Sequence, residues 1–401
     1  MAELFDIEEI EEKVILVGVS EQDGDDAEDS VSELAELVKT AGAVVVGTLI
    51  QKREIRHAGT YIGTGKVEDL AELIQTLGAT GIVCDDELTP AQLKNLEDLL
   101  DTKVMDRTLV ILDIFAARAS TSEGKIQVEL AQLKYRLGRL AGLGCSMSRL
   151  GGGIGTRGPG EKKLEMDRRL IKDRIAQLNR ELKEVRMHRE VTRSQREKNG
   201  KPVAAIVGYT NAGKSTLLNT LTDANVLEED KLFATLDPTT RILELKGRQE
   251  ILLTDTVGFI RKLPHHLIEA FKSTLEEAKY ADYILHVVDA SNPQMDKQMH
   301  IVYETLYNLE VKNKTIITLF NKQDARTDKE PLHDFKADYT LGISAKYGSG
   351  LEELKDLLCE ILRENKVLVE RVIPYTNAGI IQQIRKSGEL LEEEYQADGI
   401  Y

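Results

Sequence analysis

The pattern of apolar and polar positions predicts alternating strands and helices in two separate regions of the chain. From Lys13 to about Arg118, short apolar runs alternate with stretches of helical spacing, which indicates a small α/β domain with a mostly parallel sheet. The same alternation returns between residue 202 and about residue 366. In this second region we expect strands at Val203–Val207, Arg241–Leu245, Ile251–Thr254, Ile284–Val288, Thr315–Phe320 and Tyr339–Ile343.

A different apolar spacing separates the two regions. Leucine, isoleucine and valine recur with 4-3-4-3 spacing in two stretches, which is the pattern of coiled-coil seams. Between them, Leu150–Glu161 is too rich in glycine to be helical, so we expect two helices that fold back antiparallel around a flexible tip. The seam positions are Ile126, Leu130, Leu133, Leu137 and Leu140, followed by Ile171, Ile175, Leu178, Leu182 and Val185.

These patterns divide the chain into four parts. We expect an N-terminal α/β domain at residues 1–118, a helical coiled-coil arm with a Gly-rich tip at 119–200, a second α/β domain at 201–366 and a short C-terminal α+β tail at 367–401. A chain of 401 residues with 41% apolar content is long enough to bury several cores, which fits this division.

The distribution of charge changes what the net charge implies. A formal net charge of −15 argues against a nucleic-acid partner, since an acidic surface repels phosphates. Residues 116–200, however, hold 20 Lys and Arg against 10 Asp and Glu, and this basic segment predicts polyanion binding by the arm. A solvated helical face is the alternative interpretation. The candidate RNA contacts at the tip are Arg149, Arg157, Lys162 and Lys163.

Hydropathy and cysteine usage favour a cytosolic protein. No stretch approaches the ~20 apolar residues of a membrane span, and the N-terminus lacks the basic start of an export signal. The three cysteines are scattered without a C-x-x-C pair, which argues against a disulfide framework or a zinc site.

Candidate chemistry begins directly after the first strand of the second α/β region. Residues 208–215 read Gly-Tyr-Thr-Asn-Ala-Gly-Lys-Ser and fit the pattern G-x-x-x-x-G-K-[ST], between a predicted strand and a predicted helix. In such a loop the backbone N–H groups surround phosphates, the lysine reaches the β- and γ-phosphates, and the hydroxyl binds Mg²⁺. We expect phosphate or Mg²⁺ contacts from Gly208, Tyr209, Thr210, Asn211, Ala212, Gly213, Lys214 and Ser215.

A second motif, Asp255-Thr256-Val257-Gly258, follows the predicted strand Ile251–Thr254. A carboxylate at this position can join the Mg²⁺ shell, and a glycine allows the backbone to approach the γ-phosphate closely. The next residue is Phe259, where Ras-like enzymes carry the Gln that orients the attacking water. We therefore expect Lys214 and Gly258 to support the transition state, no certain catalytic residue in cis, and slow hydrolysis that a partner accelerates.

Two further motifs predict that the base is guanine. Asn321, Lys322, Gln323 and Asp324 follow a predicted strand, at the sheet edge where ligands bind in this architecture. Asp324 can accept hydrogen bonds from N1–H and the N2 amine of guanine, which adenine cannot supply. Ser344, Ala345 and Lys346 end the next predicted strand and would add a backbone N–H. The substrate expected from these motifs is GTP.

The loop between the phosphate motif and Asp255 must supply a threonine that closes over Mg²⁺ and the γ-phosphate. Spacing alone does not separate Thr235, Thr239 and Thr240. A glycine-rich stretch at Gly59–Lys66 is not a second phosphate loop, because Thr60 stands where the first glycine is needed and Val67 where the hydroxyl is needed. We expect a turn before a helix at that position.

The chain resembles the HflX family of translational GTPases. The resemblance rests on the Gly151–Glu161 loop, on Phe233–Arg241, which reads Phe-Ala-Thr-Leu-Asp-Pro-Thr-Thr-Arg, and on Asp255–Ile260. It covers nearly the whole chain. It implies that Ser215 and Thr235 are the Mg²⁺ ligands and that the segment Phe233, Ala234, Thr235, Leu236 and Asp237 contacts the nucleotide.

The resemblance also implies a function. Such a GTPase would be cytosolic, sometimes membrane-associated, and monomeric off the ribosome; it would bind the large ribosomal subunit and its rRNA, and split stalled or idle ribosomes. An ATP-dependent activity suggested for the N-terminal domain of relatives finds no phosphate loop at Gly59–Lys66. Two alternatives stay open: a GTPase of ribosome assembly or RNA modification, and a nucleotide-gated switch whose arm binds a protein.

Overall fold

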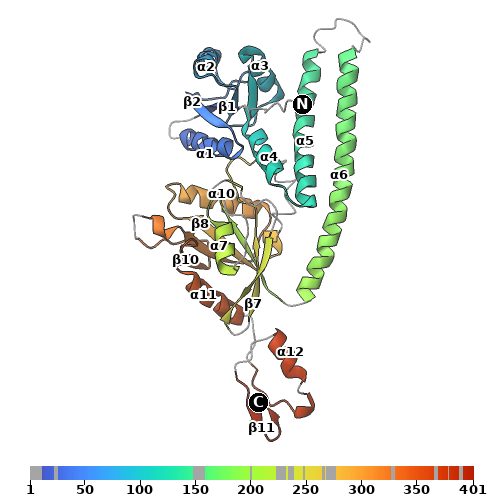
Figure 1. Cartoon of the computed structure of the whole chain (residues 1–401), viewed down its shortest axis with the longest axis vertical. Coiled ribbons are helices and arrows are strands. Elements are labelled where there is room, and N and C mark those ends of the chain that lie inside the picture. Colours follow the sequence, from blue (N-terminus) through green and yellow to red (C-terminus); the bar gives the residue numbers. More distant parts are fainter. Residues whose placement is uncertain are drawn as a thin grey trace, which may run out of the picture. The chain divides into compact units, whose positions relative to one another are not determined.

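Contacts divide the chain into two compact units. The first comprises Met1–Val185, Lys231–Phe233 and Arg261–Phe271, and the second comprises Arg186–Asp230, Ala234–Ile260 and Lys272–Tyr401. The division into four domains stays a prediction. The computed structural model (Figure 1) describes residues 11–21, 26–147, 159–198, 201–222, 232–233, 239–246, 249–263, 267, 277–326, 330–364, 369–377, 379–387 and 392–401.

The first unit contains the expected small parallel α/β fold. Its four strands lie in the order β2-β1-β3-β4, and every neighbouring pair is parallel. The elements are β1 (Lys13–Ser20), α1 (Ala27–Thr40), β2 (Val44–Lys52), α2 (Thr64–Leu77), β3 (Gly81–Cys84), α3 (Pro90–Leu100), β4 (Lys103–Asp106) and α4 (Arg107–Arg118). The Gly-rich stretch before α2 therefore ends in a helix that begins at Thr64, as expected.

Side chains on both faces of β1 are buried. Ile15 and Val17 pack with Leu70 of α2 and Leu96 of α3 in one buried cluster. Such burial is what a strand covered by helices on both faces requires. Helix α3 begins with a capping box in which the Thr89 side chain accepts a hydrogen bond from the N–H of Gln92.

The arm consists of α5 (Ser122–Met147) and α6 (Pro159–Lys198), which lie side by side (Figure 1). The central part of the predicted seam is confirmed: three leucines are buried together, and three further seam residues pack against them. Across the seam, two guanidinium nitrogens of Arg174, Nε and Nη2, donate to the two carboxylate oxygens of Glu129 at 2.7 and 2.9 Å. The buried leucines are Leu130, Leu178 and Leu182, and their neighbours are Ile126, Leu133 and Ile175.

The second unit holds a six-stranded sheet in the order β10-β9-β8-β5-β7-β6. All neighbouring pairs are parallel except β6 and β7, which are antiparallel, so one edge departs from the parallel pattern expected from the sequence. The strands are β5 (Val203–Gly208), β6 (Thr239–Glu244), β7 (Glu250–Asp255), β8 (Tyr283–Asp289), β9 (Thr315–Asn321) and β10 (Tyr339–Gly342).

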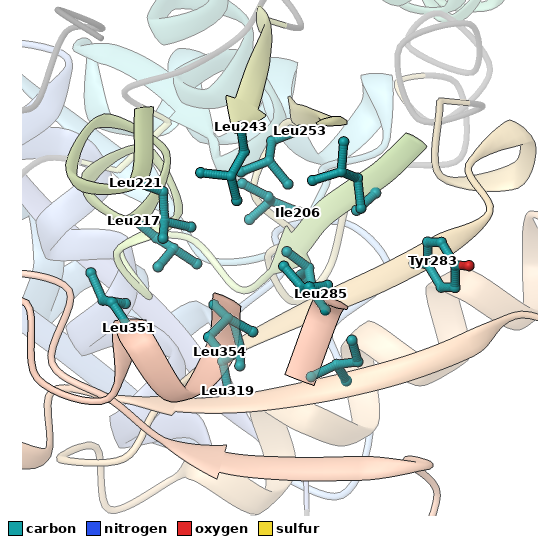
Figure 2. Close-up of a cluster of buried hydrophobic side chains, with 14 of the residues drawn as sticks. Ile206, Leu217, Leu221, Leu243, Leu253, Tyr283, Leu285, Leu319, Leu351 and Leu354 are labelled. Carbon is teal, nitrogen blue, oxygen red and sulfur yellow. The ribbon is translucent and has the colours of Figure 1, made fainter. Parts of the chain in front are cut away.

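One face of this sheet packs against α7 (Lys214–Thr222) and α11 (Leu351–Glu364) in a single apolar core (Figure 2). Leu217 of α7, Leu285 of β8 and Leu354 of α11 are fully buried in it. Each buried leucine contributes about 2 kcal/mol of hydrophobic free energy, so the core fixes both helices on the sheet. A third helix, α10 (Met295–Asn308), packs on β8 through the rings of Tyr303 and His286.

The register of the strands brings the motif residues to one edge of the sheet. Ile206 is paired with Asp255, Gly208 with Val287, and Asp289 with Asn321. Because these strands are parallel, the loops after β5, β7, β8 and β9 all leave from the same side.

The C-terminal tail contains small elements. They are η4 (Tyr375–Asn377), α12 (Gly379–Ser387) and the antiparallel pair β11 (Tyr395–Gln396) and β12 (Gly399–Ile400), with Ile373 bridging to Ile400. In the part of the chain that the structure describes, no helix is both long and apolar enough to cross a membrane.

Candidate functional site

The loop between β5 and α7 is held in a tight form by its two glycines. Gly213 has φ +94°, a backbone conformation that side chains rarely adopt. A Cβ at Gly208 would collide with the carbonyl oxygen of Val287, and a Cβ at Gly213 would collide with the amide of Asn321. The loop therefore leads the backbone into the N-terminus of α7, where N–H groups and the helix dipole favour phosphate.

Lys214 is buried at the start of α7. Its Nζ donates to the carbonyl oxygen of Tyr209 at 2.8 Å. Burial lowers the pKa of Lys214 to about 8, an effect that the nearby carboxylate of Asp255 opposes. An anionic phosphate beside this ammonium would favour its charged form, as the carboxylate of Asp255 does.

Ser215 and Asp255 form an oxygen pair suited to Mg²⁺. The Ser215 hydroxyl donates to Oδ2 of Asp255 at 2.9 Å, and Asp255 is completely buried at the end of β7. A hydroxyl beside a buried carboxylate is the donor set that Mg²⁺ takes together with phosphate oxygens. These two residues fit the expected ion, as inner- or outer-shell ligands.

The segment after Asp255 lies directly on the phosphate loop. The N–H of Thr210 donates to the carbonyl of Phe259 at 2.8 Å, and the N–H of Phe259 donates to the carbonyl of Gly208 at 3.1 Å. A Cβ on Gly258 would lie 2.8 Å from Nζ of Lys214 and 2.9 Å from Cα of Thr210. Glycine is therefore required at 258 by close packing. The hydroxyl of Thr256, also in this segment, donates to the carbonyl of Ile206, and Val257 is buried.

Asn321 ties three loops together. Its side-chain amide donates to the carbonyl of Ala212 at 2.8 Å, and its side-chain oxygen accepts from the N–H of Ala345 at 2.9 Å. The hydroxyl of Ser344 donates to Asp324 at 2.5 Å and holds that carboxylate at the sheet edge. The phosphate loop, the Asn-Lys-Gln-Asp loop and the Ser-Ala-Lys loop thus converge.

Lys322 has a partner that the sequence did not suggest. Its Nζ donates to Asp289, the last residue of β8, at 2.7 Å, and its own φ is +61°. Gln323 donates through its side chain to the carbonyl of Phe320 at 3.2 Å. Asp289 ends a buried strand at the same edge of the sheet as Asn321. That strand-end position is the signal in the sequence that could have indicated this partner.

Several predicted residues cannot be placed by the structure. Ala234, Thr235, Leu236 and Asp237 lie outside the described residues, as do Arg149 and Arg157. Lys162 and Lys163 lie on α6, but their side chains are not described. Lys346 lies with its Nζ 5.4 Å from the ring centre of Tyr347.

Two of the three threonines that could close over the ion lie among the described residues. Thr239 and Thr240 are the first residues of β6, where Thr239 pairs with Asp255 and the Thr240 hydroxyl lies 3.1 Å from that of Thr254. Thr235 itself is not described, so the choice among the three stays a prediction. Phe233, in the first unit, is buried, and its ring meets Phe115 edge-on at 4.7 Å.

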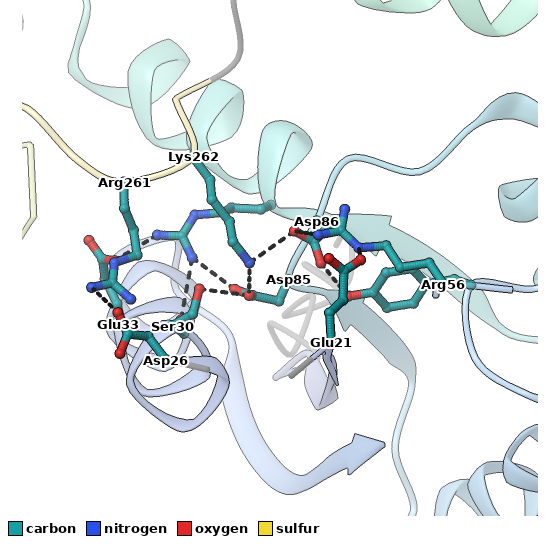
Figure 3. Close-up of polar contacts among 11 residues, drawn as sticks. Glu21, Asp26, Ser30, Glu33, Arg56, Asp85, Asp86, Arg261 and Lys262 are labelled. Carbon is teal, nitrogen blue, oxygen red and sulfur yellow. Dashed lines mark hydrogen bonds and ion pairs between the residues drawn. The ribbon is translucent and has the colours of Figure 1, made fainter. Parts of the chain in front are cut away.

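A buried polar network in the first unit lies outside these motifs (Figure 3). Arg107 donates to Asp85 at 2.8 Å and to Glu33 at 2.9 Å, and Lys262 donates to Asp85 and Asp86. Burial acts to raise the pKa of Asp86, but the ammonium of Lys262, the hydroxyl of Tyr61 and the charge of Arg56 together hold that pKa below its usual value. Residues far apart in the sequence form this network, so no local sequence pattern predicts it.

The mostly parallel sheet, the glycine-lysine loop and the Asn-Lys-Gln-Asp loop at one edge define a P-loop GTPase. Three family models match adjoining segments: a GTP-binding GTPase N-terminal model at residues 28–116, a GTP-binding GTPase middle-region model at 118–196 and a 50S ribosome-binding GTPase model at 203–322. With the relatives described next, these matches show that the chain belongs to the HflX family of GTPases.

Two relatives span nearly the whole chain. The GTPase HflX of Lacrimispora saccharolytica is 68% identical over 401 residues, covering 100% of this chain and 95% of that protein. The GTPase HflX of Escherichia coli is 41% identical over 362 residues, covering 90% of this chain and 85% of that protein. Among solved structures, the SsGBP–GDP complex is similar with a TM-score of 0.50 and 26% identity, covering 89% of this chain and 100% of that one.

Proposed function

We propose that GTP binds where the three loops meet, with its phosphates on residues 208–215 and its guanine on Asp324. The observation that carries this proposal is the pair of hydrogen bonds from Asn321, which hold the base-recognition loop against the phosphate loop. Thr256, Val257, Ser344, Ala345 and Lys346 complete the proposed contacts. Ser215 and Asp255, together with the predicted ligand Thr235, would hold Mg²⁺, which supplies positive charge beside the β- and γ-phosphates.

As a member of this family the chain hydrolyses GTP to GDP and phosphate. The side chain of Phe259 is buried and carries no hydrogen-bonding group, so it cannot orient water as the side chain of glutamine does. We infer that intrinsic turnover is slow and that a partner accelerates it by ordering the loops around the γ-phosphate.

The proposed partner is the large ribosomal subunit with its rRNA, in the cytosol. The match of residues 203–322 to the 50S ribosome-binding GTPase model supports this partner, as does the basic arm. Neutralising rRNA phosphates releases counterions, so a basic arm gains affinity that falls as salt rises. The finer proposal is that the GTP-bound form splits stalled or idle ribosomes and that hydrolysis releases it.

Ribosome profiles on sucrose gradients test this function. The intact chain and a variant lacking residues 144–162 are mixed with ribosomes in the presence of GTP, GDP or a non-hydrolysable GTP analogue. We expect the intact chain to convert ribosomes into subunits with GTP and to remain on the large subunit with the analogue, while the deletion variant does neither. Association with immature particles alone would favour an assembly role, and an RNase-resistant protein partner would favour the switch hypothesis.

A charge variant tests the arm separately. Neutralising Arg149, Arg157, Lys162 and Lys163 together should weaken large-subunit binding and flatten its salt dependence, because fewer phosphate contacts then release counterions. Binding that is insensitive to salt in the intact chain would contradict the proposed RNA contact.

A further inference from the structure

The hydroxyl of Thr210 is buried without a hydrogen-bond partner. Thr210 is 6% exposed, and its Oγ1 has no hydrogen-bond partner among the residues that the structure describes. Other buried threonines of the same unit behave differently: the hydroxyl of Thr256 donates to a carbonyl, and that of Thr318 donates to Asp334. Buried polar groups are nearly always bonded, so an exception at a functional site calls for an explanation.

Thr210 lies where the γ-phosphate is expected. A Cβ on Gly258 would lie 2.9 Å from Cα and from Cγ2 of Thr210, and 2.8 Å from Nζ of Lys214. The side chain of Thr210, the ammonium of Lys214 and the backbone of Gly258 therefore converge on one place. In P-loop GTPases the lysine and the glycine of these motifs are the groups that approach the γ-phosphate.

Hydrogen bonds hold the backbone of Thr210 and so fix where its side chain begins. Its N–H donates to the carbonyl of Phe259 at 2.8 Å, and Tyr209 forms a parallel bridge with Phe259. A group held in this way can be aligned before the reaction begins, which is the condition for an orienting role.

The reaction needs a group that orients water, and Phe259 cannot serve. In hydrolysis the water oxygen forms a bond to the γ-phosphorus while the bond from that phosphorus to the bridging oxygen breaks. The electron pair of the broken bond stays on GDP, and the protons of the water end on the products. A hydroxyl has one donor and two acceptor sites, so it can accept from the water and donate to a γ-oxygen without changing its own protonation.

We propose that the hydroxyl of Thr210 is a further catalytic group, which orients the attacking water against the γ-phosphate. The proposal rests on GTP binding at the phosphate loop as proposed above. It assigns to the third residue of that loop the task that a glutamine after the Asp-x-x-Gly motif performs in Ras-like enzymes.

The test compares Thr210→Val, which keeps the shape but loses the hydroxyl, with Thr210→Ser, which keeps the hydroxyl. Single-turnover GTP hydrolysis, the dissociation constants of GTP and GDP, and thermal melting are measured on the full chain. We expect Thr210→Val to hydrolyse about 10- to 100-fold more slowly, with both dissociation constants within about 3-fold of the original chain. Thr210→Ser should keep most of the rate.

Each other outcome overturns the proposal. An unchanged rate in Thr210→Val, or an equal loss in Thr210→Ser, would show that the hydroxyl has no such role. A rate loss matched by an equal loss of GTP affinity or of melting temperature would indicate a binding or structural role. Thr210→Ala replaces the valine variant if that variant does not fold, and failure of the unmodified chain to bind GTP would overturn the nucleotide site itself.

Discussion

The hydroxyl of Ser215 donates to the carboxylate of Asp255 across 2.9 Å and so joins the first turn of α7 to the end of β7. Forty residues separate the two in sequence. These two oxygens are the proposed Mg²⁺ ligands that the structure describes, and substitution of each tests that proposal.

Removing either oxygen should uncouple GTP binding from Mg²⁺. Ser215→Ala and Asp255→Asn each remove a ligand or weaken its charge, and we expect GTP affinity in Mg²⁺ to fall by about 10- to 100-fold. Fluorescent GTP titrated with Mg²⁺ and with a chelator measures this, and Thr216→Ala, one residue further along α7, is the matched control. A Ser215→Ala chain that keeps the full Mg²⁺ dependence would contradict the assignment.

Changing Asp324 to asparagine should change the base that is recognised. The amide can donate to the 2-oxygen of xanthine but cannot accept both guanine donors, so GDP affinity should fall by at least ~100-fold and xanthosine diphosphate should bind better. Calorimetry with both nucleotides is the measurement. Asp296→Asn, in the first turn of α10, should leave the preference unaltered. Undiminished GDP binding by Asp324→Asn would rule out the proposed base contact.

An added methyl at Gly258 should slow hydrolysis. Gly258→Ala would drive a Cβ to within 2.9 Å of the Thr210 backbone, so the segment around Phe259 must move away from the phosphate loop. We expect GTP turnover to fall by more than ~10-fold. Gly65→Ala is the control because a Cβ there meets nothing within 4 Å. Equal turnover of the two variants would show that the close packing at 258 has no role in the reaction.

Loss of Arg107 should destabilise the first unit. Arg107→Met removes the buried guanidinium to which both Glu33 and Asp85 are paired, and although Lys262 still pairs with Asp85, breaking these buried pairs costs about 3–5 kcal/mol of unfolding free energy. Urea unfolding measures the loss. Lys66→Met breaks only the exposed pair with Asp69 and should cost less than about 1 kcal/mol. If the two variants lose the same stability, the buried network is not a structural anchor.

Acid should destabilise the chain partly through His286. Burial lowers the pKa of His286 to about 4; the charge of Asp334 opposes this shift and that of Lys214 adds to it. The unfolded chain takes up the proton near pH 6.5, so stability falls as the pH drops from about 6.5 to about 4, by on the order of 3 kcal/mol in total. Below the folded pKa no further loss arises from this residue.

His286→Phe should remove that part of the pH dependence. Nδ1 of His286 has no hydrogen-bond partner among the described residues, and phenylalanine can keep the edge-on contact with Tyr303. Urea midpoints at pH 7.5, 6 and 5 should therefore lie closer together for this variant, while His300→Asn, on α10, should behave like the unmodified chain. A pH dependence in His286→Phe as large as in the unmodified chain would assign the effect to other groups.

The fold was predictable where local pattern and topology agree. Parallel strands must end at one edge, so the placement of Gly208, Asp255 and Asn321 followed from strand assignments alone, and the register confirms it. The antiparallel edge strand β6 was not foreseen, because the short apolar pattern of this strand does not fix its direction. In the arm, the heptad spacing predicted more seam positions than the central apolar cluster contains.

Long-range polar contacts leave no mark on the local sequence pattern. The partner of Lys322 is Asp289, 33 positions away, and that of Arg107 is Glu33, 74 positions away, and neither spacing has a local signature. The same holds for the backbone bonds between Thr210 and Phe259, because they join main-chain atoms that any residue carries.

The double hydrogen bond of Asn321 has a consequence for how the whole nucleotide is sensed. The side chain of Asn321 bonds both the phosphate loop and the Ser-Ala-Lys loop, so a ligand that orders the base-recognition loops would also order the phosphate loop. Guanosine alone and inorganic triphosphate alone would each bear the cost of ordering these loops, whereas GTP bears it once. The binding free energy of GTP should therefore exceed the sum of those of the two fragments.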